Sequence, residues 1–281
     1  WSSDVCSSDL APLIRAAATV PSPDARQARD GETPADVARR AAAALEAHLA
    51  QHHATIAALI VEPLIQCASG MAMYDPEYLR LARSLCDRYD VHLICDEIAV
   101  GCGRTGTFFA HDQADIRPDF ICLSKGISGG YLPLSIVLTT DAVYGAFYDD
   151  ATARGFLHSH SYTGNALACR AALATLDIFR EDDVLKQNID RAQKLWNALA
   201  PLAEHPQVTH LRQRGMIIAF DVKSGDPAFS RRFYRSALAN EALIRPIGNT
   251  VYLMPPYIIS DEEIAHLGQA TANALNEALT Q

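Results

Sequence analysis

The clearest strand signal in the chain lies in VHLICDEIAVGCGRTG, residues 91–106. Residues 91–95 form an apolar run of strand length, which ends in the acidic pair Asp96 and Glu97. A strand that is apolar throughout is typical of a parallel sheet covered by helices. We therefore predict an α/β fold with this strand inside its sheet.

Three more apolar runs predict further strands of this sheet, at residues 56–61, 120–123 and 134–138. Amphipathic segments separate the runs. A helix is expected from residue 33 to about 51, and another opens at Asp75-Pro76. Alternation of strands with helices favours a mostly parallel sheet with helices on both faces.

The pattern changes after about residue 180. Helices are expected after Asn165, from about residue 183 to 199, from 228 to 240 and from Ser260, with strands at 216–222 and 251–254. We predict part of a large domain at residues 11–180 and a smaller α+β domain at 181–281. The first ten residues, WSSDVCSSDL, contain a near-repeat without helical periodicity, so a foreign or artefactual segment is expected there.

Composition excludes several classes of protein. The 281 residues carry a formal charge of −9, which argues against a nucleic-acid partner. Seven cysteines without a CxxC pair provide neither a disulfide framework nor a zinc signature, and no apolar run approaches the roughly 18 residues of a membrane span. We expect a cytoplasmic protein.

Polar residues follow three of the predicted strands: Glu62, the Asp96-Glu97 pair, and Ser124-Lys125. Ligands of open α/β sheets bind beyond the carboxyl ends of the strands, where these residues would meet. A lysine there can bind an aldehyde covalently, and a carboxylate can keep a ring nitrogen protonated. Pyridoxal phosphate chemistry needs both. The alternative is a surface lysine with a helix-capping acid.

Two other motifs suggest different chemistry. Residues 101–106, GCGRTG, fit the dinucleotide pattern GxGxxG, but they neither follow the strand directly nor open an obvious helix, which disfavours a nicotinamide site. His158 and His160 could share one strand face, yet no third ligand is close in sequence, so no metal site is predicted. The hydroxyl-rich residues 159–165 precede a helix and suit a phosphate, or Asn165 is an ordinary N-cap.

Taken in order, VEP (61–63), DEI (96–98), GCGRTG (101–106) and SKG (124–126) resemble the class III (fold type I) aminotransferases. The likeness covers about residues 30–281. Residues 126–140, 158–165 and 244–259 are most similar to family members that act on 8-amino-7-oxononanoate in biotin synthesis, with S-adenosylmethionine as amino donor.

The resemblance implies a pyridoxal 5′-phosphate site. Lys125 would bind the cofactor covalently and move the proton between substrate Cα and cofactor C4′. Asp96 would pair with the pyridine nitrogen, and Ile98 would pack on the ring. His160 would lie against the cofactor, and Ser161 would reach its phosphate across the interface of a homodimer.

The same resemblance places Ser159 and Arg245 at the substrate, with Arg245 holding the carboxylate of 8-amino-7-oxononanoate. Family members carry a further N-terminal stretch with a phosphate loop that is not visible here, so weak cofactor binding by this chain alone is expected. Two alternatives stay open. One is a class III enzyme for an ω-amino acid such as ornithine, 4-aminobutyrate or β-alanine, and the other is a catalytically silent dimerisation fragment.

Overall fold

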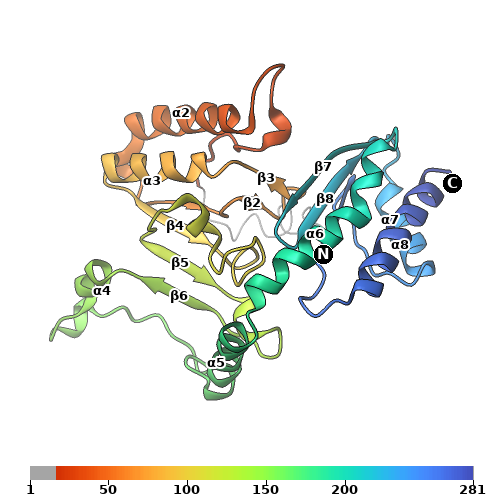
Figure 1. Ribbon diagram of the computed structural model, residues 1–281. Coiled ribbons are helices and arrows are strands. Elements are labelled where there is room, and N and C mark those ends of the chain that lie inside the picture. Colours follow the sequence, from red (N-terminus) through yellow and green to blue (C-terminus); the bar gives the residue numbers. More distant parts are fainter. Residues whose placement is uncertain (1–16, 281) are drawn as a thin grey trace.

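The computed structural model describes residues 17–280, which form two groups of elements side by side (Figure 1). The first group holds a four-stranded sheet with two helices over it, and the second holds a three-stranded sheet with three helices. The foreign segment predicted at residues 1–10 lies outside the described residues.

The larger sheet has the strand order β1-β4-β5-β6. Its strands are β1 (Ala58–Val61), β4 (His92–Asp96), β5 (Phe120–Leu123) and β6 (Ile136–Thr139). The first three are parallel, and β6 runs antiparallel to β5. The connection from β5 to β6 holds only a short 3-10 turn, whereas a parallel crossover needs a longer connection, usually a helix. The predicted mostly parallel sheet is confirmed.

Helices α2 (Pro34–His52) and α3 (Glu77–Tyr89) cover one face of this sheet (Figure 1). Thr33 and Asp36 form a reciprocal capping box at the start of α2, as the sequence around Pro34 suggests. Leucines of both helices are buried together with the inward residues of β4, which include Leu93 and Cys95. On the opposite face, Ile60 and Val137 are 61% and 62% exposed.

The part of the chain before residue 184 also contains a short hairpin, an irregular loop and two further helices. The hairpin pairs β2 (Ile65–Gln66) with β3 (Ala72–Met73), and the helices are α4 (Asp141–Phe147) and α5 (Ala166–Glu181). Residues 155–165 form coil and turn, so His158 and His160 do not share a strand face. No described strand pairs with this segment, and Asn165 ends it by capping α5 through hydrogen bonds from Leu167 N and Ala168 N.

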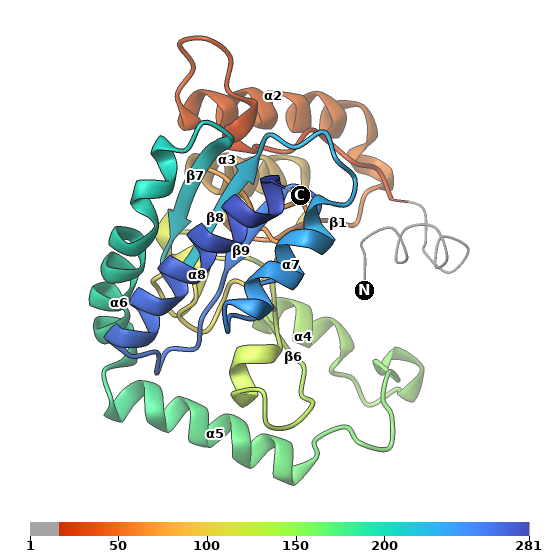
Figure 2. The ribbon, with the colours of Figure 1, turned by 90° about the vertical axis from the view of Figure 1, so that its right-hand side faces the viewer.

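The second group is an antiparallel sheet, β7-β8-β9, with helices packed on it (Figure 2). Its elements are α6 (Val184–Leu199), β7 (Val208–Arg214), β8 (Ile217–Val222), α7 (Phe229–Ala239), β9 (Thr250–Leu253) and α8 (Asp261–Thr280). Phe220, Phe229 and Phe233 lie fully buried at its centre. This core draws its buried residues from positions 195–278. The domain boundary near residue 181 stays a prediction.

Short 3-10 turns complete the described chain: η2 (Ala25–Gln27), η3 (His53–Thr55), η4 (Ala110–Ala114), η5 (Lys125–Ser128), η6 (Thr152–Arg154) and η7 (Ala200–Glu204). Of these, η4 and η5 flank the candidate site. The first ends the loop that follows β4, and the second begins at Lys125.

Candidate active site

The carboxyl ends of β1, β4 and β5 meet at one rim of the larger sheet, as the sequence predicts. Val61 pairs with Cys95, and Asp96 pairs with Cys122, so the residues that follow each strand leave the sheet together. The charges of Asp96 and Lys125 both act on the Glu62 carboxyl. Burial raises the pKa of this carboxyl and the negative charge of Asp96 adds to this, against opposing effects of a Cys67 hydrogen bond and of Lys125.

Asp96 is half-buried at the last position of β4. Its Oδ1 accepts a hydrogen bond from Ile98 N at 3.0 Å, so the carboxylate is oriented by the loop that follows it. Side chains alternate along a strand, so Asp96 lies on the face opposite its buried neighbour Cys95. It therefore faces away from α2 and α3, at the open side of the rim.

Lys125 adopts a backbone conformation that is rare for its residue type. Its φ is +46°, in the left-handed region, and its side chain is exposed at the start of η5. Such a conformation disfavours a residue with a Cβ by roughly 1–2 kcal/mol, and strain of this kind clusters at functional sites. Next to it, a Cβ on Gly126 would lie 2.8 Å from the Cβ of Cys102, so only glycine allows this approach of the two loops.

Lys125 and Ile98 line one cavity of about 1120 Å³, which extends to residues of the second group of elements. Arg104 and Tyr257 line it too, and sequence reasoning missed both. The Arg104 guanidinium lies 4.3 Å from the centroid of the Tyr257 ring and donates to Pro255 O at 2.7 Å. Burial lowers the pKa of Arg104. Its position in GCGRTG was the available signal, since that motif was weighed as a nucleotide loop and as a family likeness, without a role for its arginine.

The GCGRTG loop joins the two groups of elements. Arg104 O accepts from Met216 N at 3.0 Å, and the hydroxyl of Tyr257 donates to Cys102 O at 2.7 Å. A Cβ on Gly215 would lie 2.5–2.7 Å from the backbone of residues 104–106. Bends at residues 107–109 and the 3-10 turn η4 follow the motif, so it does not open the α-helix that a dinucleotide fingerprint requires.

Arg245 lies in a second, smaller cavity of about 790 Å³. Met254 and Pro256 line both this cavity and that of Lys125, so the two adjoin. Arg245 is exposed, and Glu241, Glu263 and His266 contribute the other titratable groups of its cavity apart from Tyr234 and Tyr252. The Arg245 guanidinium therefore lies in a cavity that adjoins the cavity of Lys125.

The remaining predicted residues lie elsewhere in the single chain. Ser159, His160 and Ser161 are exposed between α4 and α5, and none of them lines the cavity that holds Lys125. His160 is held locally: its N–H donates to Thr163 Oγ1, and its Nδ1 accepts from Tyr162 N. Their assignments to cofactor and substrate stay predictions.

Neither a metal cluster nor a membrane span is found among residues 17–280. No group of three or more His, Cys, Asp or Glu side chains is placed there to hold a metal ion. The helices in this range are too short or too polar to cross a membrane.

A lysine and two carboxylates thus stand at the ends of adjacent parallel strands. Comparison with known families shows which class of protein has this arrangement. A family model described as aminotransferase class-III matches residues 1–275, and the chain belongs to this family.

Among curated relatives, the adenosylmethionine-8-amino-7-oxononanoate aminotransferase of Helicobacter pylori is 48% identical over 240 residues, which cover 83% of this chain and 55% of that protein. The enzyme of the same name from Synechococcus elongatus is 40% identical, covering 85% of this chain and 57% of its own length. The chain thus spans about half the length of these relatives.

Solved structures give the same result. The adenosylmethionine-8-amino-7-oxononanoate aminotransferase of Methanocaldococcus jannaschii superposes with a TM-score of 0.87 at 30% identity, covering 98% of this chain and 63% of that one. An omega transaminase from Pseudomonas jessenii, solved in complex with PMP, has a TM-score of 0.86 at 28% identity, covering 93% of this chain and 60% of that one. The predicted family and fold class are confirmed.

Proposed function

We propose that the protein containing this chain transfers an amino group from S-adenosylmethionine to 8-amino-7-oxononanoate, as a step of biotin biosynthesis. The names of the relatives support this substrate pair. The observation that carries the chemistry is that a strained, exposed lysine and a carboxylate stand at the carboxyl ends of the adjacent strands β5 and β4.

These residues fit pyridoxal 5′-phosphate as cofactor. When bound, the cofactor supplies an electron sink that stabilises negative charge at the substrate Cα. Lys125 would offer the amine that holds the cofactor aldehyde. Once the substrate amine takes its place on the cofactor, the freed Lys125 amine would carry the proton from Cα to C4′. Asp96 holds a proton on the pyridine nitrogen, and Ile98 packs on the ring. His160 is proposed to lie against the same cofactor.

Arg245 is proposed to bind the carboxylate of 8-amino-7-oxononanoate, with Ser159 contacting substrate nearby. A guanidinium holds a carboxylate through two parallel hydrogen bonds. Between Arg245 and the lysine cavity lie Met254 and Pro256, which are apolar. Adjoining cavities of this kind suit a substrate whose carboxylate is separated from its reacting carbon by an apolar chain.

We further propose a cytoplasmic homodimer in which Ser161 of one subunit contacts the cofactor phosphate bound to the other. The segment that carries Ser161 exposes Tyr148, Phe156 and Leu157, which are 77%, 69% and 89% accessible in the single chain. Exposed apolar side chains grouped along one segment favour a protein interface.

A second candidate is an omega transaminase for another amino substrate. The chain superposes almost as well on the Pseudomonas jessenii omega transaminase, with a TM-score of 0.86 against 0.87, so the fold alone does not separate the two candidates. Separate half-reactions do: the first proposal requires S-adenosylmethionine to give its amino group to the cofactor and 8-amino-7-oxononanoate to receive it, whereas the second requires an ω-amino acid to be the amino donor in place of S-adenosylmethionine.

The test uses the product of the complete gene, loaded with pyridoxal 5′-phosphate. Borohydride reduction followed by peptide mapping should find the pyridoxyl label on Lys125. The exposed Lys186 serves as control, since Lys186→Ala should label like the wild type. A label on Lys186 or Lys194 would contradict the assignment, and absence of visible absorbance with added cofactor would favour a silent fragment.

A further inference from the structure

Glu97 directly follows Asp96, yet it points the other way and is 1% exposed. Its N–H donates to Cys122 O at 3.0 Å, which continues the ladder between β4 and β5 by one residue. Successive side chains of extended backbone point to opposite faces. Since Asp96 faces the open side of the rim, Glu97 faces the protein interior. A buried carboxylate needs hydrogen-bond donors to offset its lost hydration.

Three donors surround the Glu97 carboxylate, and all come from the start of η4. Oε2 accepts from Ala110 N at 2.8 Å, and Oε1 accepts from His111 N at 2.9 Å. The ring nitrogen Nδ1 of His111 donates to the same Oε1 at 2.8 Å. His111 is buried, and its ring stacks on that of Phe109. The carboxylate thus fixes the far end of the loop that leaves β4.

The near end of this loop is fixed to Glu97 as well. Gly101 N donates to Glu97 O at 2.9 Å, and a Cβ at Gly101 would lie 2.8 Å from that oxygen. One residue therefore ties both ends of the segment 98–111. The segment supplies Ile98, Cys102 and Arg104 to the cavity of Lys125, and Ile98 N is the donor that orients Asp96.

We propose that Glu97, through His111 and the two backbone N–H groups, is a positioning residue for the cofactor site. By holding segment 98–111 it keeps Ile98 and Cys102 beside Lys125 and keeps the Asp96 carboxylate in place. This inference rests on the proposed function, because segment 98–111 is the part of the cavity that would face pyridoxal 5′-phosphate.

Glu97→Gln is the informative variant, because it preserves shape but replaces one acceptor oxygen with an NH₂ group. Whichever way the amide turns, its NH₂ faces a backbone N–H, of Ala110 or of His111, and that buried donor is left unpaired. His111→Phe is the milder variant, since it keeps a buried ring and removes only the side-chain donor.

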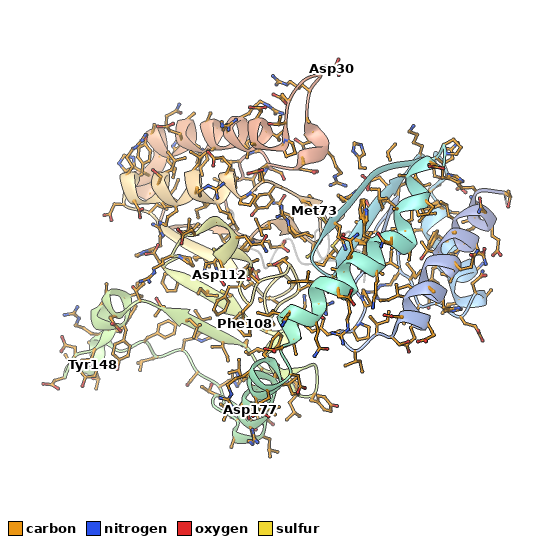
Figure 3. All side chains as sticks on the ribbon, viewed as in Figure 1. Asp30, Met73, Phe108, Asp112, Tyr148 and Asp177 are labelled. Atoms are coloured by element: carbon orange, nitrogen blue, oxygen red, sulfur yellow. The ribbon has the colours of Figure 1, made fainter. Side chains whose placement is uncertain are left out.

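Asp115→Asn is the matched control: it removes one carboxylate charge from an exposed side chain just past η4, and none of the hydrogen bonds of the described residues joins that carboxylate to segment 98–111. Asp112, labelled in Figure 3, is unsuitable, because its carboxylate accepts from Phe109 N and lies 3.8 Å from the His111 ring.

The experiment measures two properties of the complete gene product. Amide hydrogen exchange of segment 98–111, without cofactor, should be faster by about tenfold or more in Glu97→Gln, less so in His111→Phe, and unchanged in Asp115→Asn. The affinity for pyridoxal 5′-phosphate, from an absorbance titration at a temperature where every variant is folded, should fall by about tenfold in Glu97→Gln.

The two readouts separate the possible failures. Unchanged exchange in Glu97→Gln would overturn the proposal, and so would faster exchange with wild-type cofactor affinity, which is the result of a purely structural role. If Glu97→Gln does not fold, His111→Phe decides by the same two criteria. A wild-type protein that takes up no cofactor would instead refute the proposed function, and exchange would still show whether Glu97 holds the loop.

Discussion

The rim of the larger sheet and the segment 141–165 build their parts of the proposed site in opposite ways. At the rim, the parallel ladder sets the positions of Asp96 and Lys125 relative to each other, and the close approach of Cys102 to Gly126 holds the loops. Segment 141–165 contains one short helix, α4, and its apolar side chains face outward. It projects from the body of the molecule in Figure 1.

This difference indicates which parts of the proposed site depend on formation of the homodimer. The lysine and the carboxylate rest on hydrogen bonds and packing within this chain. The proposed phosphate contact, Ser161, lies on a segment with few buried contacts of its own. We therefore expect changes at the rim to act on chemistry directly and changes on the segment to act through cofactor binding and dimer formation.

The largest effect is expected at Lys125. Lys125→Ala removes both the covalent attachment and the proton carrier, and loss of proton transfer alone lowers rates by about 10²–10⁴-fold. Turnover of the complete enzyme should fall to background. Single-turnover kinetics with 8-amino-7-oxononanoate measure this, with Lys186→Ala as control. Residual turnover within tenfold of the wild type would show that another group moves the proton.

The second largest effect is expected for Asp96→Asn. A carboxylate about 4 Å from a pyridinium interacts by roughly 4 kcal/mol at an effective dielectric near 20. Its loss should slow removal of the Cα proton by about a thousandfold, while borohydride still labels Lys125. Asp115→Asn, an exposed acid of the same part of the chain, is the control. Wild-type single-turnover rates in Asp96→Asn would eliminate its role at the ring nitrogen.

Arg245→Ala tests the second cavity. A charge-assisted contact contributes about 1.5–3 kcal/mol, so the half-reaction with 8-amino-7-oxononanoate should weaken by about 10- to 150-fold. The half-reaction with S-adenosylmethionine should lose less, because that donor's carboxylate need not occupy the same position. Stopped-flow spectroscopy measures both, with Arg235→Ala on the exposed side of α7 as control. Equal losses in the two half-reactions would show that Arg245 supports the fold or cofactor binding and does not select the substrate.

Ser161→Ala should have the smallest effect. Losing one hydroxyl contact to a phosphate should reduce cofactor affinity by about tenfold, with the rate at saturating cofactor nearly unchanged. Thr152→Ala, on the same segment, is the control. Sedimentation should show a dimer whose dissociation constant rises when cofactor is removed. A cofactor-saturated, active monomer would contradict the shared site.

The rim was predictable from sequence because its signals are local and strong. Three apolar runs that each end in polar residues require only one assumption, that parallel strands align their carboxyl ends. The bounds of β5 match the predicted residues 120–123, and those of α6 begin one residue after Asp183. Most of the fold followed from such runs.

The parts missed by prediction carry weaker signals. Strand β7, VTHLRQR, is polar and is interrupted by a register shift between Thr209 and Arg212, so neither a continuous apolar run nor regular alternation marks it. Helix α4 is short and contains Gly145, although Thr140 does cap it. Arg104 could be found only in three dimensions, because its partner Tyr257 lies far along the chain.

The left-handed backbone at Lys125 has a consequence for the history of this sequence. A lysine whose amine no longer mattered would be replaced easily by glycine, which adopts a φ of +46° without steric conflict and relieves the strain. Selection for stability alone therefore acts against lysine at this position, and only selection for the amine retains it. Within descendants of this chain, position 125 should distinguish lineages that kept an active site from those that kept only the fold.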